Sequence, residues 1–131
     1  MSVIPSLAAG LAQLQALANF LDTGSSNATV SFYKGTKPAN VTVVANPSNK
    51  LVTMNLPEPC FKQLNADSIE LYPTDTATVT QAGTATWARL YNGNGDAVAD
   101  FAVGTDITLA NPNLVLGSML MINSIVLRPS T

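Results

Sequence analysis

The spacing of hydrophobic positions changes once along the chain, near residue 28. Before it, apolar residues recur every three or four positions, which is the period of an α-helix with one apolar face. These residues are Leu7, Leu11, Leu14, Ala18 and Leu21. Pro5 and Ser6 suit the first turn of such a helix, and Gly24 suits the position beyond its end. The pattern predicts one helix in a segment of residues 1–24.

The opposite face of this helix is small and polar but carries no charge. It holds Ala8, Ala12, Gln15 and Asn19. Two interpretations follow: the helix packs on its own domain, or it is an arm that docks on a neighbouring subunit, because an uncharged face can be buried at modest cost. For the second interpretation we expect contacts at Leu7, Leu11, Leu14 and Phe20.

From residue 28 onward the hydrophobic period is 2, which is typical of strands. The strand-like stretches are residues 28–35, 41–46, 51–56, 68–73, 76–92, 96–104, 106–111 and 114–129. The stretch 76–92 is expected to bend near Ala82 and Gly83, and the last stretch, which is nearly continuous, is expected to be buried on both faces. With no second helical pattern, these stretches predict an all-β fold: an antiparallel, jelly-roll-like β-sandwich of about eight strands with one N-terminal α-helix. We expect one domain, with a helical arm at 1–24 and the sandwich at 25–131.

Residues 83–101 predict a hairpin, because two alternating runs flank two Asn-Gly pairs. Asn92-Gly93 or Asn94-Gly95 would suit a type I′ turn, whose central residues have positive φ. Alternation places Trp87, Arg89 and Tyr91 on one face of the first strand. Arg89 is then able to lie across the Trp87 indole or to pair with Asp96 or Asp100 on the returning strand, which would hold this corner together.

The same stretch has two features that a binding function would use. A calcium loop starting at Asn92 fails, because the required glycine falls on Ala97 and the bidentate acid falls on Val103. A lectin would use Trp87 as an exposed sugar platform, but a core or corner role is favoured for the one tryptophan of the chain.

The chain has few charges for its length. Charged residues make up 11% and hydrophobic residues 47%, with a net charge of -2, whereas an ordinary soluble domain has about 25% charged residues. The six basic residues are scattered, so no stripe is expected to neutralise phosphates and nucleic acid is not an expected partner. Such a charge-poor surface predicts that neighbouring proteins cover part of it, although a weakly charged monomer is the alternative.

Candidate chemistry is sparse. The chain contains no histidine and one cysteine, so His-based triads, the usual zinc ligand sets and an internal disulfide are absent. Cys60 is expected to be a small buried apolar residue. Residues 1–21 carry no charge, and Gln13, Gln15 and Asn19 interrupt their apolar run, so neither a secretory signal nor a membrane span is expected. The sequence predicts no enzyme, no cofactor and no metal site.

Several short motifs resemble those of small virion proteins of tailed bacteriophages. The motifs are Tyr-x-Gly-x-x-Pro before a Leu-rich strand, Gly-Thr-Ala-x-Trp-x-Arg, Asp-x-x-Val-Gly, and a hydrophobic strand pair that begins near a glycine. They match here at Tyr33, Gly35, Pro38, Leu51, Gly83, Thr84, Ala85, Trp87, Arg89, Asp100, Val103, Gly104 and Gly117. The resemblance runs from residue 20 to residue 128 and departs from the pattern in residues 72–82.

The resemblance implies a jelly-roll cement or decoration protein without catalytic residues. Such proteins sit on icosahedral heads between capsid subunits, often as symmetric oligomers. The expected partners are therefore the major capsid protein and further copies of this chain, as a dimer or a trimer. The expected location is the surface of the virion head, after synthesis in the cytoplasm of the bacterial host. A tail or baseplate component and a carbohydrate- or receptor-binding sandwich are the alternatives.

Overall fold

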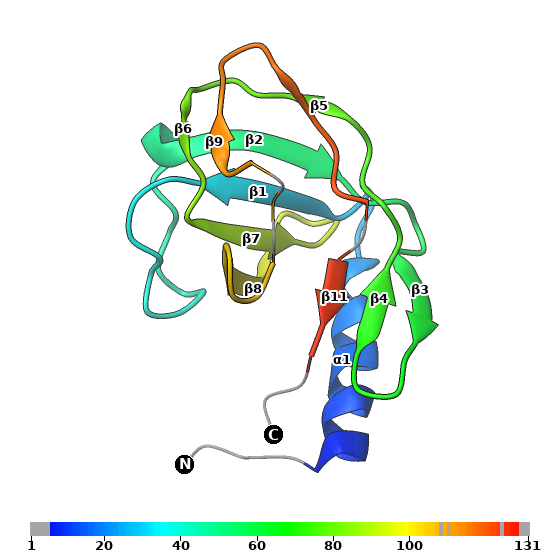
Figure 1. Ribbon diagram of the computed structural model, residues 1–131. Helices are drawn as coiled ribbons and strands as arrows, with labels where there is room; N and C mark the ends of the chain where they lie inside the picture. Colours follow the sequence, from blue (N-terminus) through cyan, green and yellow to red (C-terminus); the bar gives the residue numbers. More distant parts are fainter. Residues whose placement is uncertain (1–5, 108, 110, 124, 129–131) are drawn as a thin grey trace.

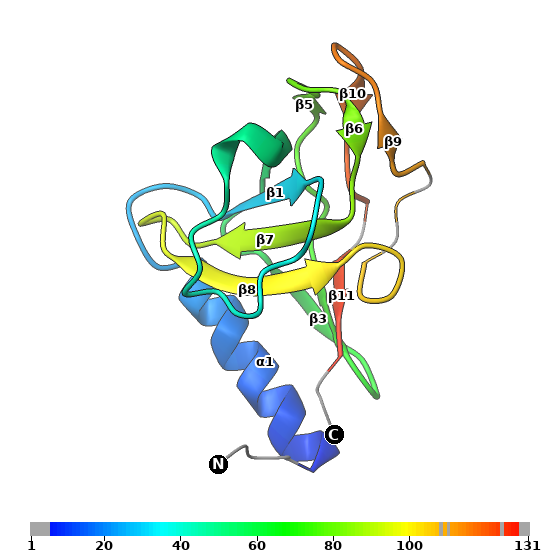
Figure 2. The ribbon, with the colours of Figure 1, turned by 90° about the vertical axis from the view of Figure 1, so that its left-hand side faces the viewer.

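The structure is a computed structural model that describes residues 6–107, 109, 111–123 and 125–128. It is mainly β, with one helix near the N-terminus and several small antiparallel sheets (Figure 1). The helix lies at one end of the molecule, and the turn between β9 (Asn113–Leu114) and β10 (Met119–Leu120) lies at the other end in both views (Figures 1 and 2). The described strands form no closed barrel.

Helix α1 spans Leu7–Leu21, as the apolar period predicts. It begins at Ser6, whose hydroxyl accepts a hydrogen bond from the Ala9 N–H at 3.2 Å and so satisfies one of the free donors of the first turn. Its buried residues are Gly10, Ala18 and Leu21, and Ala18 and Leu21 have no exposed area. The helix therefore packs on its own chain, against β3 (Phe61–Leu64), β4 (Ile69–Leu71) and β8 (Ala97–Ala102).

The largest sheet has four antiparallel strands in the order β2-β1-β7-β8. Its further strands are β2 (Lys50–Asn55), β1 (Thr29–Tyr33) and β7 (Trp87–Tyr91). One edge of this sheet is covered, because the segment after β4 runs along β2 and donates hydrogen bonds from Thr80 N to Leu51 O at 2.9 Å and from Asp75 N to Asn55 O at 3.0 Å. Strand β8 forms the other edge.

Three smaller sheets complete the structure. One has the order β11-β4-β3, where β11 is Ile125–Leu127. The other two are pairs: β10 with β5 (Ala77–Thr78), and β9 with β6 (Gly83–Thr84). A short 3-10 helix at Pro47–Asn49 precedes β2.

The core lies between one face of the four-stranded sheet, the smaller sheets and the end of α1. Every second residue of β1 and β7 faces it, as the period of 2 predicts. Its fully buried large apolar residues include Val30, Phe32, Leu51, Met54, Leu56, Ile69, Leu71 and Leu90. Burying each such side chain contributes about 1.5–3 kcal/mol relative to leaving it exposed.

The predicted helix and the predominance of β structure are confirmed. The strands expected within 28–35, 51–56, 68–73 and 96–104 are present as β1, β2, β4 and β8. The stretch 76–92 is bent as predicted, but more strongly: it divides into β5, β6 and β7. Strand β3 was not predicted, because residues 57–61 carry two prolines that interrupt the strand pattern before it.

The predicted strand at 41–46 is wrong. The chain turns at residues 40–43 instead, where the Asn40 side-chain oxygen accepts a hydrogen bond from Thr42 N at 3.0 Å and the Asn40 carbonyl accepts one from Val43 N at 3.3 Å. Asparagine at the start of such a turn offers the backbone an alternative to a strand ladder. The valines of this segment are left at the surface, with Val44 88% exposed.

The prediction of a nearly continuous strand over 114–129, buried on both faces, is also wrong: Val115 and Leu116 are each 65% exposed. The described part of this run holds three separate two- and three-residue strands, β9, β10 and β11. A turn separates β9 from β10, and Gly117 adopts a positive φ of 86° in it, a conformation that favours glycine. For 106–111, no strand is found among the described residues, and Thr108, Ala110 and residues 129–131 lie outside them.

Candidate functional site

Trp87 and Arg89 lie on the face of the four-stranded sheet that points away from the core. Their side chains are buried all the same: both residues are 2% exposed. Arg89 donates hydrogen bonds to both carboxylate oxygens of Asp100, at 2.6 and 3.0 Å, and its guanidinium carbon lies 5.3 Å from the centre of the Trp87 ring. The structure thus brings together the three residues that the hairpin pattern singled out, and Asp100 rather than Asp96 is the partner.

The arginine also fixes the neighbouring loop. Its remaining nitrogen donates to the Val43 carbonyl at 2.8 Å, which ties the loop of residues 36–46 to the sheet. The hydrogen bonds to Asp100 raise the pKa of the Arg89 guanidinium further, so it stays charged at any physiological pH. A buried, bidentate pair of this kind holds two strands in one register.

Tyr33 completes this corner. Its ring stacks on Trp87, with centroids 4.3 Å apart and planes inclined by 15°, and its hydroxyl forms a 2.7 Å hydrogen bond with the Tyr91 hydroxyl. Burial raises the pKa of the Tyr33 hydroxyl, and the hydrogen bond with Tyr91 acts in the same direction. Because Trp87 is covered on this face, it is not the exposed platform that sugar binding through this residue requires.

The turn of the β7–β8 hairpin differs from the predicted type. Asn92 and Asn94 have no positive φ, whereas a type I′ turn requires it at both central residues. Instead, Gly95 N donates to Asn92 O at 2.9 Å and Gly95 has φ 85°, which is a three-residue loop with glycine at the left-handed position. The Asn92 side-chain oxygen accepts hydrogen bonds from Asn94 N and Asp96 N, both at 3.0 Å, so it serves the turn.

Gly93 anchors this hairpin tip to the segment that follows α1. Its N–H donates to the Thr23 carbonyl at 2.8 Å, and a Cβ at this position would overlap the carbonyl oxygen of Ser26. The chain approaches so closely here that only glycine fits. Asn92 and Gly93 thus have a structural role at a buried contact.

The four helix residues expected to contact a partner fall into two pairs. Leu11 and Leu14 are partly buried and pack against the core of their own chain. Leu7 and Phe20 are 45% and 47% exposed. The structure therefore supports the helix packed on its own domain for most of its length, and leaves two apolar side chains available at its surface.

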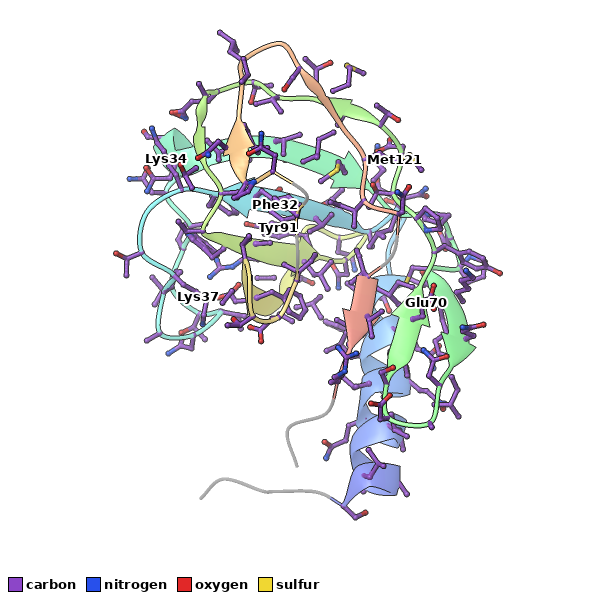
Figure 3. All side chains as sticks on the ribbon, in the orientation of Figure 1. Phe32, Lys34, Lys37, Glu70, Tyr91 and Met121 are labelled. Carbon is purple, nitrogen blue, oxygen red and sulfur yellow. The ribbon has the colours of Figure 1, made fainter. Side chains whose placement is uncertain are left out.

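The largest group of exposed apolar residues lies elsewhere, at the β9–β10 end of the molecule. Val115 and Leu116 are each 65% exposed, Met119 is 62% exposed and Met121 is 45% exposed. Val115, Met119 and Met121 line a groove of about 500 Å³, and none of its lining residues that the structure describes carries a charge. Leu116 adjoins this groove in sequence. We name this surface, Val115, Leu116, Met119 and Met121 with the groove, the apolar end. In Figure 3, the labelled Met121 and the labelled Lys37 of the loop 36–46 lie on opposite sides of the molecule.

Side chains able to do chemistry are sparse among the described residues. Cys60 is buried, as predicted. Burial, the larger cause, and the nearby Asp22 carboxylate, the smaller one, together raise the pKa of its thiol to about 12. No group of three or more His, Cys, Asp or Glu side chains is placed to hold a metal ion in the described part of the chain. No helix in that part has the length and apolar character needed to span a membrane.

Comparison with known proteins identifies no relative: no family model, no curated protein and no solved structure matches the chain.

The apolar end is the feature that sequence reasoning missed. The signal for it was present, because residues 114–122 combine large apolar residues with Gly117 and Ser118, a pair that favours a turn. A turn within an apolar run cannot bury all of its side chains, so exposure was predictable from this pair.

Proposed function

We propose that this chain is a non-enzymatic structural protein of a tailed-bacteriophage virion, a cement or decoration protein that joins other copies of itself and bridges major capsid proteins on the head. The proposal includes a jelly-roll-like sandwich as the finer description of its sheets. The observation that carries it is the apolar end, where four large apolar side chains are exposed and three of them, Val115, Met119 and Met121, line an uncharged groove.

An apolar surface of this kind is unfavourable in free energy while it faces water. Exposed apolar groups gain about 25 cal/mol per Å² when another protein covers them, and a groove without charges has no ionic group to desolvate. A chain with 11% charged residues gives weak electrostatic attraction, so the binding energy has to come from apolar contact. Many copies bound to one shell then strengthen the shell, because each copy adds buried area between neighbouring subunits.

The test uses heads that lack this protein. Purified wild-type chain is added back, and the copies bound per particle and the thermal stability of the heads are measured. We expect saturable binding that withstands about 0.5 M NaCl, because salt screens charges and leaves apolar contacts intact. Leu116→Asp should abolish binding, whereas Leu64→Asp, at a 52% exposed leucine of β3, should leave it unchanged.

Two outcomes contradict the proposal. Release of the protein by that salt concentration would show that charges carry the contact. A handful of copies per particle, in place of hundreds, would assign the chain to the tail or baseplate. A receptor-binding role through Trp87 is disfavoured, because the residue is buried and Tyr33 stacks on its ring.

A further inference from the structure

A second groove lies between helix α1 and the edges of two sheets. It has a volume of about 480 Å³ and is lined by α1, by β8, by the turn after β8 and by β11. Leu14, Leu17 and Phe101 give it apolar walls, while Asp106 and Arg128 lie at its rim. Both β8 and β11 are the end strands of their sheets, so two sheet edges border one apolar groove.

The outer edge of β8 is only partly occupied by its own chain. Val103 N, directly after β8, donates to Thr86 O, directly before β7, at 3.0 Å. Ala102 points the other way, and the turn after β8 occupies it: its N–H donates to Asp106 Oδ2 at 2.9 Å, and its carbonyl accepts from Asp106 N at 3.0 Å and Ile107 N at 3.2 Å. Since backbone groups alternate along a strand, the N–H and C=O of Asp100 point to the outer edge as well. They have no backbone partner among the described residues. Such an edge is a template for an added extended segment.

The same molecule carries a segment suited to that template. The loop of residues 36–46 contains Asn-Val-Thr-Val-Val-Ala-Asn, a β-branched run that reads as a strand but has no strand partner in the structure. Val43 is 46% exposed and Val44 is 88% exposed. Lys37 of this loop is exposed and makes no ion pair with another described residue.

We propose that the loop 36–46 of one copy docks in the groove between α1, β8 and β11 of a second copy. The exposed valines enter the apolar groove, the loop backbone pairs with the open N–H and C=O of Asp100 in β8, and Lys37 meets Asp106 at the rim. Asp106 uses one carboxylate oxygen for Ala102 N, which leaves the other for a cation. This inference deepens the proposed function by specifying how copies join, and its test uses the purified chain alone.

Complementary charges favour a second copy over an unrelated partner. The groove offers an acid at its rim, and the loop offers an exposed lysine beside exposed valines, with no acidic residue in 36–46. The other two charged lining residues have partners in their own chain: Asp100 is paired with Arg89, and Arg128 lies 4.0 Å from Asp67. Apolar and ionic features therefore match between two surfaces of one chain.

The experiment is a charge exchange read by sedimentation velocity over a range of protein concentrations. Wild-type chain should self-associate, and Val44→Asp should weaken the association about tenfold or more, because a charge then has to enter an apolar groove. Lys37→Glu and Asp106→Lys should each weaken it several-fold by placing like charges together. The mixture of these two variants, or the double variant, should regain most of the wild-type affinity.

A cross-linking measurement guards against variants that disturb the fold. Val44→Cys chains are mixed with Thr105→Cys chains, Thr105 being an exposed residue of the groove, and a disulfide between the two should form under mild oxidation. Cys60 is buried and should not compete. Leu116→Cys replaces Val44→Cys as the matched control, and it should give no such product.

Three results would overturn the inference: a wild-type chain that stays monomeric at every concentration, a Val44→Asp chain that associates like wild type, or equal cross-linking from Leu116→Cys. None of them bears on binding to heads through the apolar end. If Leu116→Asp abolishes head binding while Val44→Asp does not change self-association, the proposed function stands and this interface fails.

Discussion

The outer face of the four-stranded sheet and the apolar end differ in which side chains they bury. The sheet face carries Arg89, Asp100, two tyrosines and a tryptophan, yet its charged pair is almost completely buried. The apolar end carries valine, leucine and methionines, yet these are mostly exposed. Residue type alone therefore does not set burial here. The charged pair tolerates burial because Arg89 and Asp100 are hydrogen-bonded to each other, and the apolar end is open because a turn divides it.

This comparison distinguishes residues that stabilise the fold from residues that are available to bind another protein. A buried, hydrogen-bonded ion pair is costly to break, because the remaining charge stays in an apolar surrounding. Exposed apolar side chains contribute little to the folded state and become useful only when another surface covers them. We expect substitutions on the sheet face to change folding, and substitutions at the apolar end to change binding.

The largest effect is expected at the buried ion pair. Arg89→Met should lower the free energy of unfolding by about 3–5 kcal/mol, because it leaves the Asp100 carboxylate buried without its partner. The matched control is Arg128→Met, at a pair whose side chains are 66% and 69% exposed, which should cost at most about 1 kcal/mol. Denaturant unfolding measures both, and equal losses would contradict the distinction between the two pairs.

A comparison of two methionines gives the next effect in size. Met54 has no exposed area in β2, so Met54→Ala should cost about 2–5 kcal/mol through lost burial and the cavity left behind. Met119 is 62% exposed at the apolar end, so Met119→Ala should stay within about 0.5 kcal/mol of wild type in stability. Thermal or denaturant unfolding decides the point, and a large loss for Met119→Ala would show that the apolar end belongs to the core.

The smallest effect concerns the buried thiol. The pKa of Cys60 rises from 9.0 to about 12 in the folded chain, so the unfolded chain releases this proton first. Stability from this group is complete below pH 9 and declines as the pH rises from 9 toward 12. Cys60→Ala should make the decline of stability over this interval shallower than in wild type, when unfolding is measured at a series of pH values. Identical slopes would contradict the prediction.

Periodicity predicted the parts of the fold in which local pattern and packing agree. The three- and four-residue spacing found α1, and alternation found β1, β2, β4, β7 and β8. It failed for 41–46, where Asn40 stabilises a turn by local hydrogen bonds, and for 114–129, where Gly117 and Ser118 divide the run. In both places turn-forming residues outweighed a favourable strand composition.

The candidate surfaces were predictable only in part. The Arg89–Asp100 pair followed from two strands of one hairpin, because cross-strand neighbours can be inferred from alternation. The groove beside β8 was not predictable, because it needs the arrangement of α1, two sheets and a turn, which no local pattern contains. Lys37 and Asp106 likewise become a candidate pair only when loop and groove are seen on the same folded chain.

The position of the helix has a practical consequence for display. The start of α1 and the β9–β10 turn lie at opposite ends of the molecule (Figures 1 and 2). In the proposed function the β9–β10 end contacts the shell, so a peptide or enzyme fused ahead of Ser6 would point away from the shell, and each bound copy would present it on the outside of the particle.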